Sequence, residues 1–499
     1  MRLTPRILFT AAVAASSVWL AGCFLSADDS GPSADQKKQS ATVADQGSGQ
    51  MEGAVTNMTS SQFQYGKEDL TQLKQSQANY AEAARLNPGN SQAQLGLALT
   101  NILLAAQDPR LADVLNRTVD GKSPFNSNLA GGAPLLRSVV LAKVADASTW
   151  PEFHEIQDSI EKVLLPALED AIARVKIAYD DPNFSMTLTI QGTPKELDHA
   201  EAGILLAGIH ALHGLVTLWL SYDVDIDYNG SYAWIEALND IGSVKKFSDL
   251  TTDQRDALRK ATELFGPNAP FLAVRPAWKD RLSKVDDEIN ASLDIVRESL
   301  GSITKETDAQ DDDLIHLCAP FETGSCIATP DYQNALNAVD SARKYMNQPY
   351  VFRLTDIDTT LRVDFSAYFR VQDYKKMLPY YGFYDPKDWS DAKPAIYFTD
   401  KAGNITGDIM TLKHISDAAD SLGTPASEVV AQIRAVIHLQ DPTFQGFLPG
   451  ATEDAIWSII LKKAKLSENQ IAGTSTGPYL PKLAASTLRP DFALSLIGN

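Results

Sequence analysis

Helical periodicity over most of residues 62–305 is the feature that most constrains the fold. Apolar residues recur there at spacings of three and four, the repeat of an α-helix with one buried face. The segment 197–220 is apolar nearly all round, which predicts a central buried helix. The pattern predicts helices at Leu70–Leu86, Ser91–Gln107, Pro134–Ala145, Ile156–Tyr179, Lys195–Tyr222, Thr252–Phe265 and Ala277–Leu300. We therefore expect a mainly α protein.

The pattern changes after residue 330, where we expect a mixed but mainly helical C-terminal domain over 331–499. Residues 350–369 alternate in the manner of a strand, and residues 396–406 resemble a β-hairpin around a turn at Asp400–Asn404. This domain is therefore expected to carry a small β-hairpin or sheet. Helices are predicted at Tyr332–Met346, Thr411–Leu422, Pro425–Ile437 and Thr452–Lys465.

The N-terminus has the layout of an export signal. Arg2 and Arg6 precede an apolar run at 7–20, and Leu20-Ala21-Gly22-Cys23 follows. This resembles a bacterial lipoprotein signal peptide over 1–22 with a lipobox, which implies cleavage before Cys23 and attachment to a membrane through lipid on Cys23. A plain transmembrane anchor is disfavoured because the run is too short to span about 30 Å of hydrocarbon. Phe24 stands where Asp would resemble an inner-membrane retention signal, so the resemblance favours the outer membrane of a Gram-negative bacterium.

Residues 23–61 are predicted to form a flexible tether. Scarcely any large apolar residue follows Leu25 in this stretch, which is rich in Ser, Ala, Gly, Gln and Asp. Such a composition buries too little apolar surface to order a chain. The tether would join the lipid to the folded part.

Residues 79–98 resemble two consecutive helices of tetratricopeptide repeats. Ala83 and Ala98 are small enough for two helices to approach, Tyr80 fills the groove, and Pro88 stops the first helix. The resemblance covers about 45 residues, and no second 34-residue copy follows. It implies a degenerate, tetratricopeptide-like helical array over 62–305, which is normally a binding or scaffolding surface.

A twelve-residue loop follows the most apolar segment. The sequence from Asp225 to Glu236 fits D-x-[DN]-x-[DN]-G-x5-E and resembles an EF-hand calcium loop. The resemblance implies a structural Ca²⁺ site. Its oxygen ligands would be the side chains of Asp225, Asp227, Asn229 and Glu236 and the backbone carbonyl of Ser231. Ala233 stands at the ninth position without a side-chain oxygen, and the alternative is an Asp-rich turn that caps the next helix.

Two further cysteines, Cys318 and Cys326, lie in a polar stretch that we assign to a loop over 306–330. An exported compartment permits a disulfide between them. A redox-active pair is the alternative, and it lacks the helix-borne CxxC typical of such sites.

Aromatic residues and histidines supply two weaker patterns. The segment 379–389 concentrates aromatic residues between turn formers, and these either stack on a glycan or pack as a small satellite core: Tyr380, Tyr381, Phe383, Tyr384 and Trp389. His199, His210 and His213 share one stripe of the predicted apolar helix. Buried, hydrogen-bonded histidines are favoured there over a metal site.

Charge and motifs narrow the function. The net charge of -19 excludes a nucleic-acid partner. Gly473–Gly477 fits G-x-S-x-G but is preceded by a polar stretch instead of a buried strand, so we expect no enzyme. We expect a lipid-anchored cell-envelope protein that binds or scaffolds a protein partner. The alternative is a capture lipoprotein serving an outer-membrane or periplasmic transporter, similar in outline to SusD-type glycan-binding lipoproteins.

Overall fold

The computed structural model describes residues 31–58, 69–119, 153–190, 193–225, 251–257, 269–305, 315, 327–355, 357–377, 379–381, 437–439, 441–460 and 462. These residues are mainly helical, with small two-stranded antiparallel sheets. The chain forms two compact units that interleave in sequence, so they differ from domains divided near residue 305. Unit 1 comprises Met1–Asp120, Phe153–Leu220 and Asp280–Lys344, and unit 2 comprises Gly121–Glu152, Ser221–Lys279 and Tyr345–Asn499.

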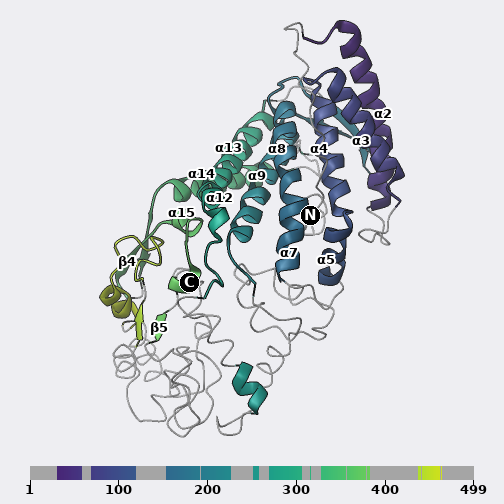
Figure 1. The fold of residues 1–499 in the computed structure, drawn as a ribbon. Coiled ribbons are helices and arrows are strands. Elements are labelled where there is room, and N and C mark those ends of the chain that lie inside the picture. Colours follow the sequence, from purple (N-terminus) through teal and green to yellow (C-terminus); the bar gives the residue numbers. More distant parts are fainter. Residues whose placement is uncertain are drawn as a thin grey trace, which may run out of the picture. The chain divides into compact units, whose positions relative to one another are not determined.

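Helix α2 (Ala34–Met58) occupies the segment predicted to be a flexible tether, and that prediction was wrong for these residues. The α2 helix packs against α3 (Thr71–Leu86) (Figure 1). Ser40 Oγ donates to the Ala83 carbonyl at 2.7 Å, and Ser76 Oγ donates to the Gly47 carbonyl at 2.8 Å. Small residues let the two backbones approach closely, so α2 is held with few large apolar side chains, of which Met51 is one.

The next helix, α4 (Ser91–Ala106), packs on α3 around the fully buried ring of Tyr80. A Cβ added at Gly96 would lie 2.2 Å from this ring, and one added at Gly47 would lie 3.1 Å from it. The ring therefore fits between two glycines on different helices. Asn90 begins α4 by accepting a hydrogen bond from the Ala93 amide at 3.0 Å. The predicted helices at 70–86 and 91–107 are confirmed.

The following helices continue the stack. Helix α5 (Pro109–Val119) was not predicted from the sequence. Helix α7 (Phe153–Ser159) runs through the π-helical turn η3 (Ile160–Leu164) into α8 (Leu165–Tyr179), which confirms the predicted helix and adds a π-turn within it. Helix α8 packs on α4 (Figure 1).

A hairpin of β1 (Ser185–Ile190) and β2 (Thr193–Asp198) leads directly into α9 (His199–Ser221). The predicted helix from Lys195 was wrong in its first turn because Asp198 caps α9. Asp198 Oδ1 accepts from the Ala200 amide at 2.7 Å and from the Glu201 amide at 3.4 Å, while Glu201 Oε2 accepts from the Asp198 amide at 3.2 Å. This reciprocal pairing is a capping box.

The predicted complete burial of α9 is only partly correct. Among the described residues, α9 is the one helix whose length and composition would allow it to cross a membrane, a test that the core helix of a soluble protein also passes. Within unit 1, α9 contacts α8 and α13 (Val285–Ile303) through its His residues. Leu215 is 52% exposed, and a Cβ at Gly208 would meet nothing within 4 Å. One stripe of α9 is therefore open.

The predicted helix at 277–300 is divided by a turn. Its parts are η5 (Pro276–Trp278), α12 (Lys279–Leu282) and α13. Helix α14 (Thr329–Asn347) confirms the predicted helix near 332–346. Arg297 on α13 pairs with Asp340 on α14 at 2.6 Å, while Tyr332 donates to the Leu300 carbonyl at 3.0 Å. These contacts make α13 and α14 antiparallel neighbours.

Unit 2 contains β3 (Tyr350–Leu354) paired with β4 (Thr359–Val363), which confirms the first part of the predicted strand region. Its last part forms the short helix α15 (Phe365–Tyr368), because Asp364 accepts from the Ser366 amide at 3.0 Å and caps it. After η6 (Tyr374–Met377), β5 (Pro379–Tyr381) pairs with β6 (Ile437–Leu439). The unit 2 core includes Val363, Val371, Phe447, Leu448 and Ile456. The hairpin predicted at 396–406 lies outside the described residues.

Candidate functional site

Most residues of the predicted sites lie outside the described part of the chain. This applies to the lipidation residue, four of the calcium ligands, the cysteine pair and three of the aromatic residues: Cys23, Asp227, Asn229, Ser231, Glu236, Cys318, Cys326, Phe383, Tyr384 and Trp389. Tyr380 and Tyr381 lie in β5, paired in register with His438 and Ile437 of β6. Asp225 is described, and it begins the predicted calcium loop.

The incoming end of this loop is fixed by backbone hydrogen bonds within unit 2. The Asp223 amide donates to the Ala273 carbonyl at 2.9 Å, and the Asp223 carbonyl accepts from the Leu272 amide at 2.6 Å. The Asp225 amide donates to Asp223 Oδ1 at 3.0 Å. Burial raises the pKa of Asp223. The structure thus holds the first loop residue in place.

A buried lysine lies in the chain segment that packs beside residues 223–225. Lys375 is 1% exposed, and its Nζ donates to the Phe271 carbonyl at 2.5 Å and pairs with Asp373 at 3.0 Å. Tyr222 donates to the Val371 carbonyl at 2.5 Å. No three His, Cys, Asp or Glu residues of the described ranges are placed to hold a metal. The calcium site stays a prediction, since its other ligands fall outside those ranges.

A group of titratable side chains in unit 1 surrounds α9. We define the α9 charge cluster as Glu169, His210, His213, Arg281 and Glu288. His210 Nδ1 lies 2.6 Å from Glu288 Oε2. His213 Nδ1 lies 3.5 Å from Glu288 Oε1, and His213 Nε2 lies 3.8 Å from Glu169 Oε1. Arg281 donates to Glu169 Oε1 at 3.0 Å. The cluster joins α9 to α8, α12 and α13.

Electrostatics in the cluster favour a positive imidazolium at His213. Burial lowers the pKa of His213, but the carboxylates of Glu169 and Glu288 outweigh burial and raise the pKa to about 9. Burial raises the pKa of Glu288, whereas His210 and His213 outweigh it and lower the pKa to about 2. His213 is therefore charged at neutral pH.

His213 links two helices that pack beside α9. The two ring nitrogens of His213 face carboxylates on two different helices, α8 and α13, so the ring bridges them. His199, the third histidine of the stripe, stacks on Tyr179 with ring centroids 4.9 Å apart. Hydrogen bonding is confirmed for His210, whereas His199 Nδ1 and both ring nitrogens of His213 are buried without a hydrogen-bond partner among the described residues.

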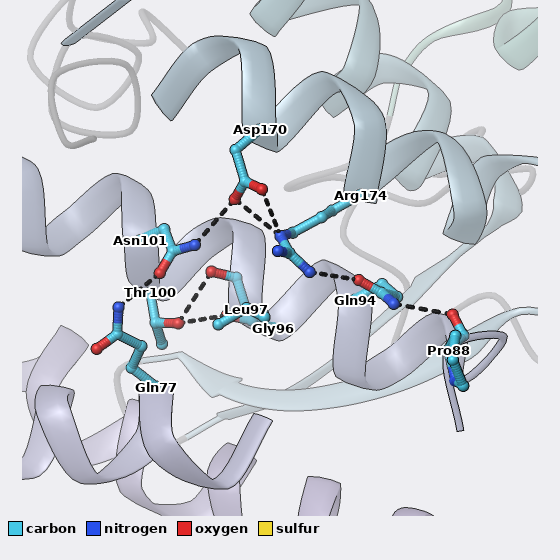
Figure 2. A network of polar contacts seen from close by, with 9 residues as sticks. All are labelled: Gln77, Pro88, Gln94, Gly96, Leu97, Thr100, Asn101, Asp170 and Arg174. Atoms are coloured by element: carbon cyan, nitrogen blue, oxygen red, sulfur yellow. Dashed lines mark hydrogen bonds and ion pairs between the residues drawn. The ribbon is translucent and has the colours of Figure 1, made fainter. Parts of the chain in front are cut away.

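A second polar network connects α3, α4 and α8 (Figure 2). Asp170 accepts from Arg174 Nε at 2.8 Å and from Asn101 Nδ2 at 2.9 Å. Arg174 also donates to Gln94 Oε1 at 2.8 Å, and Gln77 donates to Asn101 Oδ1 at 2.7 Å. Each residue drawn takes part in at least one hydrogen bond, so this network specifies which helix faces meet.

Sequence reasoning found the histidines but missed their partners. Glu169 and Glu288 are distant from α9 in the chain, and no spacing rule joins them to His213. The pair Asp170 and Arg174 has the i, i+4 spacing of a helical ion pair, which was a usable signal. The chain matches no protein-family model, no curated protein and no solved structure. The sites are therefore interpreted from their own geometry.

Proposed function

We propose that this chain is a lipid-anchored protein of the cell envelope that binds or scaffolds a protein partner. The observation that carries the proposal is the order of helices in unit 1. Each helix from α2 to α4 packs on the next, α8 packs on α4, and the α9 charge cluster joins α8, α9 and α13. Stacked helical hairpins offer long surfaces suited to protein partners. A degenerate tetratricopeptide-like array is the finer form of this proposal.

The lipid anchor is supported by the sequence around Cys23. Cells that express the chain should be labelled with an alkyne analogue of palmitate, and the label should be read on the purified protein. We expect the label to disappear in Cys23→Ala and to persist in Cys318→Ala, which removes a cysteine without a lipobox. Equal labelling of Cys23→Ala and the unsubstituted chain would contradict the anchor.

Binding to a protein is distinguished from glycan capture by Trp389. Photo-crosslinking in intact cells should give discrete protein adducts from residues exposed on α2 or α3, and Trp389→Ala should leave them unchanged. A glycan-array signal that disappears in Trp389→Ala would support the capture alternative in place of scaffolding.

Structural calcium is the second part of the proposal. Its support is the motif from Asp225 to Glu236 together with the fixed position of residues 223–225. Bound Ca²⁺ would join acidic side chains that otherwise repel one another. Asp225→Ala and Glu236→Gln should each lower the melting temperature in calcium but not in chelator. Calorimetry without calcium binding, together with equal melting in calcium and chelator, would contradict this part.

A further inference from the structure

Helix α2 is held to unit 1 mainly by small and polar side chains. Helix α4 buries Leu95, Leu97 and Ile102, which are all large and apolar. In α2, over residues 34–54, the one buried side chain that is large and apolar is Met51. The other buried residues of this stretch are Ser40, Ala44, Gly47, Ser48 and Ala54. Since stabilisation by burial grows with the apolar area removed from water, docking stabilises α2 much less than α4.

Three glycines weaken α2 as a free helix. Gly47, Gly49 and Gly53 lie in its interior, and each disfavours the helix about fivefold in the equilibrium constant relative to alanine. Such a segment does not form a stable helix in water without tertiary packing. Helix α2 is therefore helical because it is docked, and undocking unfolds it.

The surface that α2 covers offers hydrogen-bond donors. We define the α2-docking surface by residues of α3, β1 and the start of α4 that contact α2: Leu73, Ser76, Asn79, Tyr80, Ala83, Asn90, Gln92 and Thr189. Its donors bond to acceptors on α2: Asn90 Nδ2 to Ser40 Oγ at 2.8 Å, Gln92 Nε2 to Asp45 Oδ1 at 3.1 Å, Asn79 Nδ2 to Gln50 Oε1 at 3.1 Å, and the Thr189 amide to Glu52 Oε1 at 2.8 Å. Water takes the place of such bonds when two polar surfaces separate, so their net contribution to docking is modest.

The connection between α2 and α3 is longer than their packing requires. The two helices are antiparallel, since Ser40 bonds to Ala83 while Ala54 packs with Leu73. Antiparallel helices need a connection of only about 2–5 residues. Here α2 ends at Met58 and α3 begins at Thr71, so the connection is residues 59–70, which is 12 residues. A connection of this length lets α2 leave α3 and keeps it nearby, at an effective concentration on the order of 1 mM.

We propose that α2 is a displaceable helix. It undocks from α3 and α4 while the rest of unit 1 stays folded, and the α2-docking surface then receives a helix of a protein partner with small residues in the same places. Gly47 sets this pattern, because a Cβ added there would lie 3.1 Å from the Tyr80 ring. The undocking stands by itself, whereas the partner helix rests on the protein binding of the proposed function.

Hydrogen exchange at low urea concentrations measures the undocking. Protection factors should be compared between peptides of α2 and peptides of α4 in the unsubstituted chain. We expect protection at least tenfold lower in α2 and a weaker dependence on urea, because undocking exposes less surface than the unfolding of unit 1. Equal protection with a common urea dependence in both helices would overturn the proposal.

A matched pair of substitutions in α2 separates its docked face from its exposed face. Gly47→Leu places a side chain against the Tyr80 ring, whereas Gly49→Leu places it where no atom lies within 4 Å of an added Cβ. Gly47→Leu should lower the protection of α2 at least tenfold further and leave α4 unchanged. Gly49→Leu should not lower either. Loss of protection in α4 of Gly47→Leu, or equal losses in α2 of both variants, would contradict a separately docked helix.

A fluorescent peptide of residues 34–58 tests whether the α2-docking surface receives a helix from outside the chain. A docked-to-undocked ratio of about 100 at an effective concentration of about 1 mM corresponds to a dissociation constant of about 10 μM. We expect the peptide to bind the Gly47→Leu chain near this value, measured by fluorescence anisotropy. The unsubstituted chain should bind it at least tenfold more weakly, because its own α2 competes. No binding to the Gly47→Leu chain at about 1 mM peptide would overturn the partner helix.

Both measurements use the isolated chain, so their outcome is separate from photo-crosslinking in intact cells. Crosslinking that yields no protein adducts would contradict the proposed function, while low protection of α2 together with peptide binding would still establish the displaceable helix.

Discussion

Hydrophobicity gives the wrong burial for both α2 and α9, and the two errors run in opposite directions. The α2 segment has few large apolar residues, yet Ala44 is fully buried and Met51 is 2% exposed. The α9 segment is apolar nearly all round, yet Leu215 is 52% exposed. Close approach of small residues can hold a polar helix, and an apolar helix can keep one stripe open. The composition of a segment alone does not fix its burial.

The two helices also differ in how their contacts respond to pH. Around α2 the contacts are glycines against the Tyr80 ring and serine hydroxyls donating to carbonyls. Around α9 the contacts are histidines against carboxylates. The first set carries no group that titrates near neutral pH, whereas the second does. Substitutions at α2 should therefore act at every pH, and substitutions in the α9 charge cluster should act over a limited range.

Removing the Tyr80 ring should have the largest effect. Tyr80→Ala leaves a cavity between α2, α3 and α4 and should lower the free energy of unfolding by about 3–5 kcal/mol, measured by urea denaturation. Tyr80→Phe keeps the ring and loses only the hydroxyl contact with Ser48 at 2.9 Å, so it should cost about 1 kcal/mol. A cost below about 1 kcal/mol for Tyr80→Ala would show that the ring is not enclosed.

Adding a methyl group at Gly96 should have the next largest effect. The new Cβ would lie 2.2 Å from the buried Tyr80 ring, which forces the helices apart. Gly96→Ala should destabilise by about 1–3 kcal/mol in the same denaturation measurement, despite the better helix propensity of Ala. If Gly96→Ala stabilises the protein, α3 and α4 do not pack as described.

The α9 charge cluster should give a pH-dependent effect on the order of 1 kcal/mol, reduced by solvent screening. The pKa of His213 is raised to about 9 from its ordinary 6.5, so its stabilisation is complete below pH 6.5 and is lost as the pH rises through 9. The free energies of unfolding of the unsubstituted chain and of His213→Gln should therefore differ at pH 6.5 and become more alike above pH 9.

Unfolding is compared between the unsubstituted chain and His213→Gln because Glu201 titrates over the same pH range as His213. Burial, together with Asp198, raises the pKa of Glu201 to about 9. Glu201 is present in both chains, and its contribution cancels in the difference. A difference in the free energy of unfolding that is constant from pH 6 to pH 10 would refute a charged His213 between Glu169 and Glu288.

The smallest expected effect is a stabilisation at Gly208. This glycine lies in the open stripe of α9, with no atom within 4 Å of an added Cβ. Gly208→Ala should stabilise by about 0.5–1 kcal/mol through helix propensity alone, measured by thermal unfolding. It is the matched control for Gly96→Ala, since the same substitution in another helix should change the free energy of unfolding in the opposite direction. Destabilisation by Gly208→Ala would show that the stripe is covered.

The sequence was most informative where one local rule was enough. The apolar repeats located α3, α4, α8 and α14, and the alternation at 350–363 located the β3–β4 hairpin. The β1–β2 hairpin was missed because Lys195–Asp198 continues the pattern of the helix that follows. The carboxylate partners of His213 could not be predicted, because Glu169 and Glu288 reach α9 only through tertiary packing.

Hydrogen exchange in α2 tests the central claim that residues 34–58 belong to the folded body. Exchange should be followed by mass spectrometry in peptides covering 40–54, with peptides from α3 as the internal reference. We predict that amides of α2 exchange orders of magnitude more slowly than an unfolded chain, and that Tyr80→Ala accelerates them. Complete exchange of residues 40–54 at the earliest time, while α3 stays protected, would contradict the claim and restore a long tether.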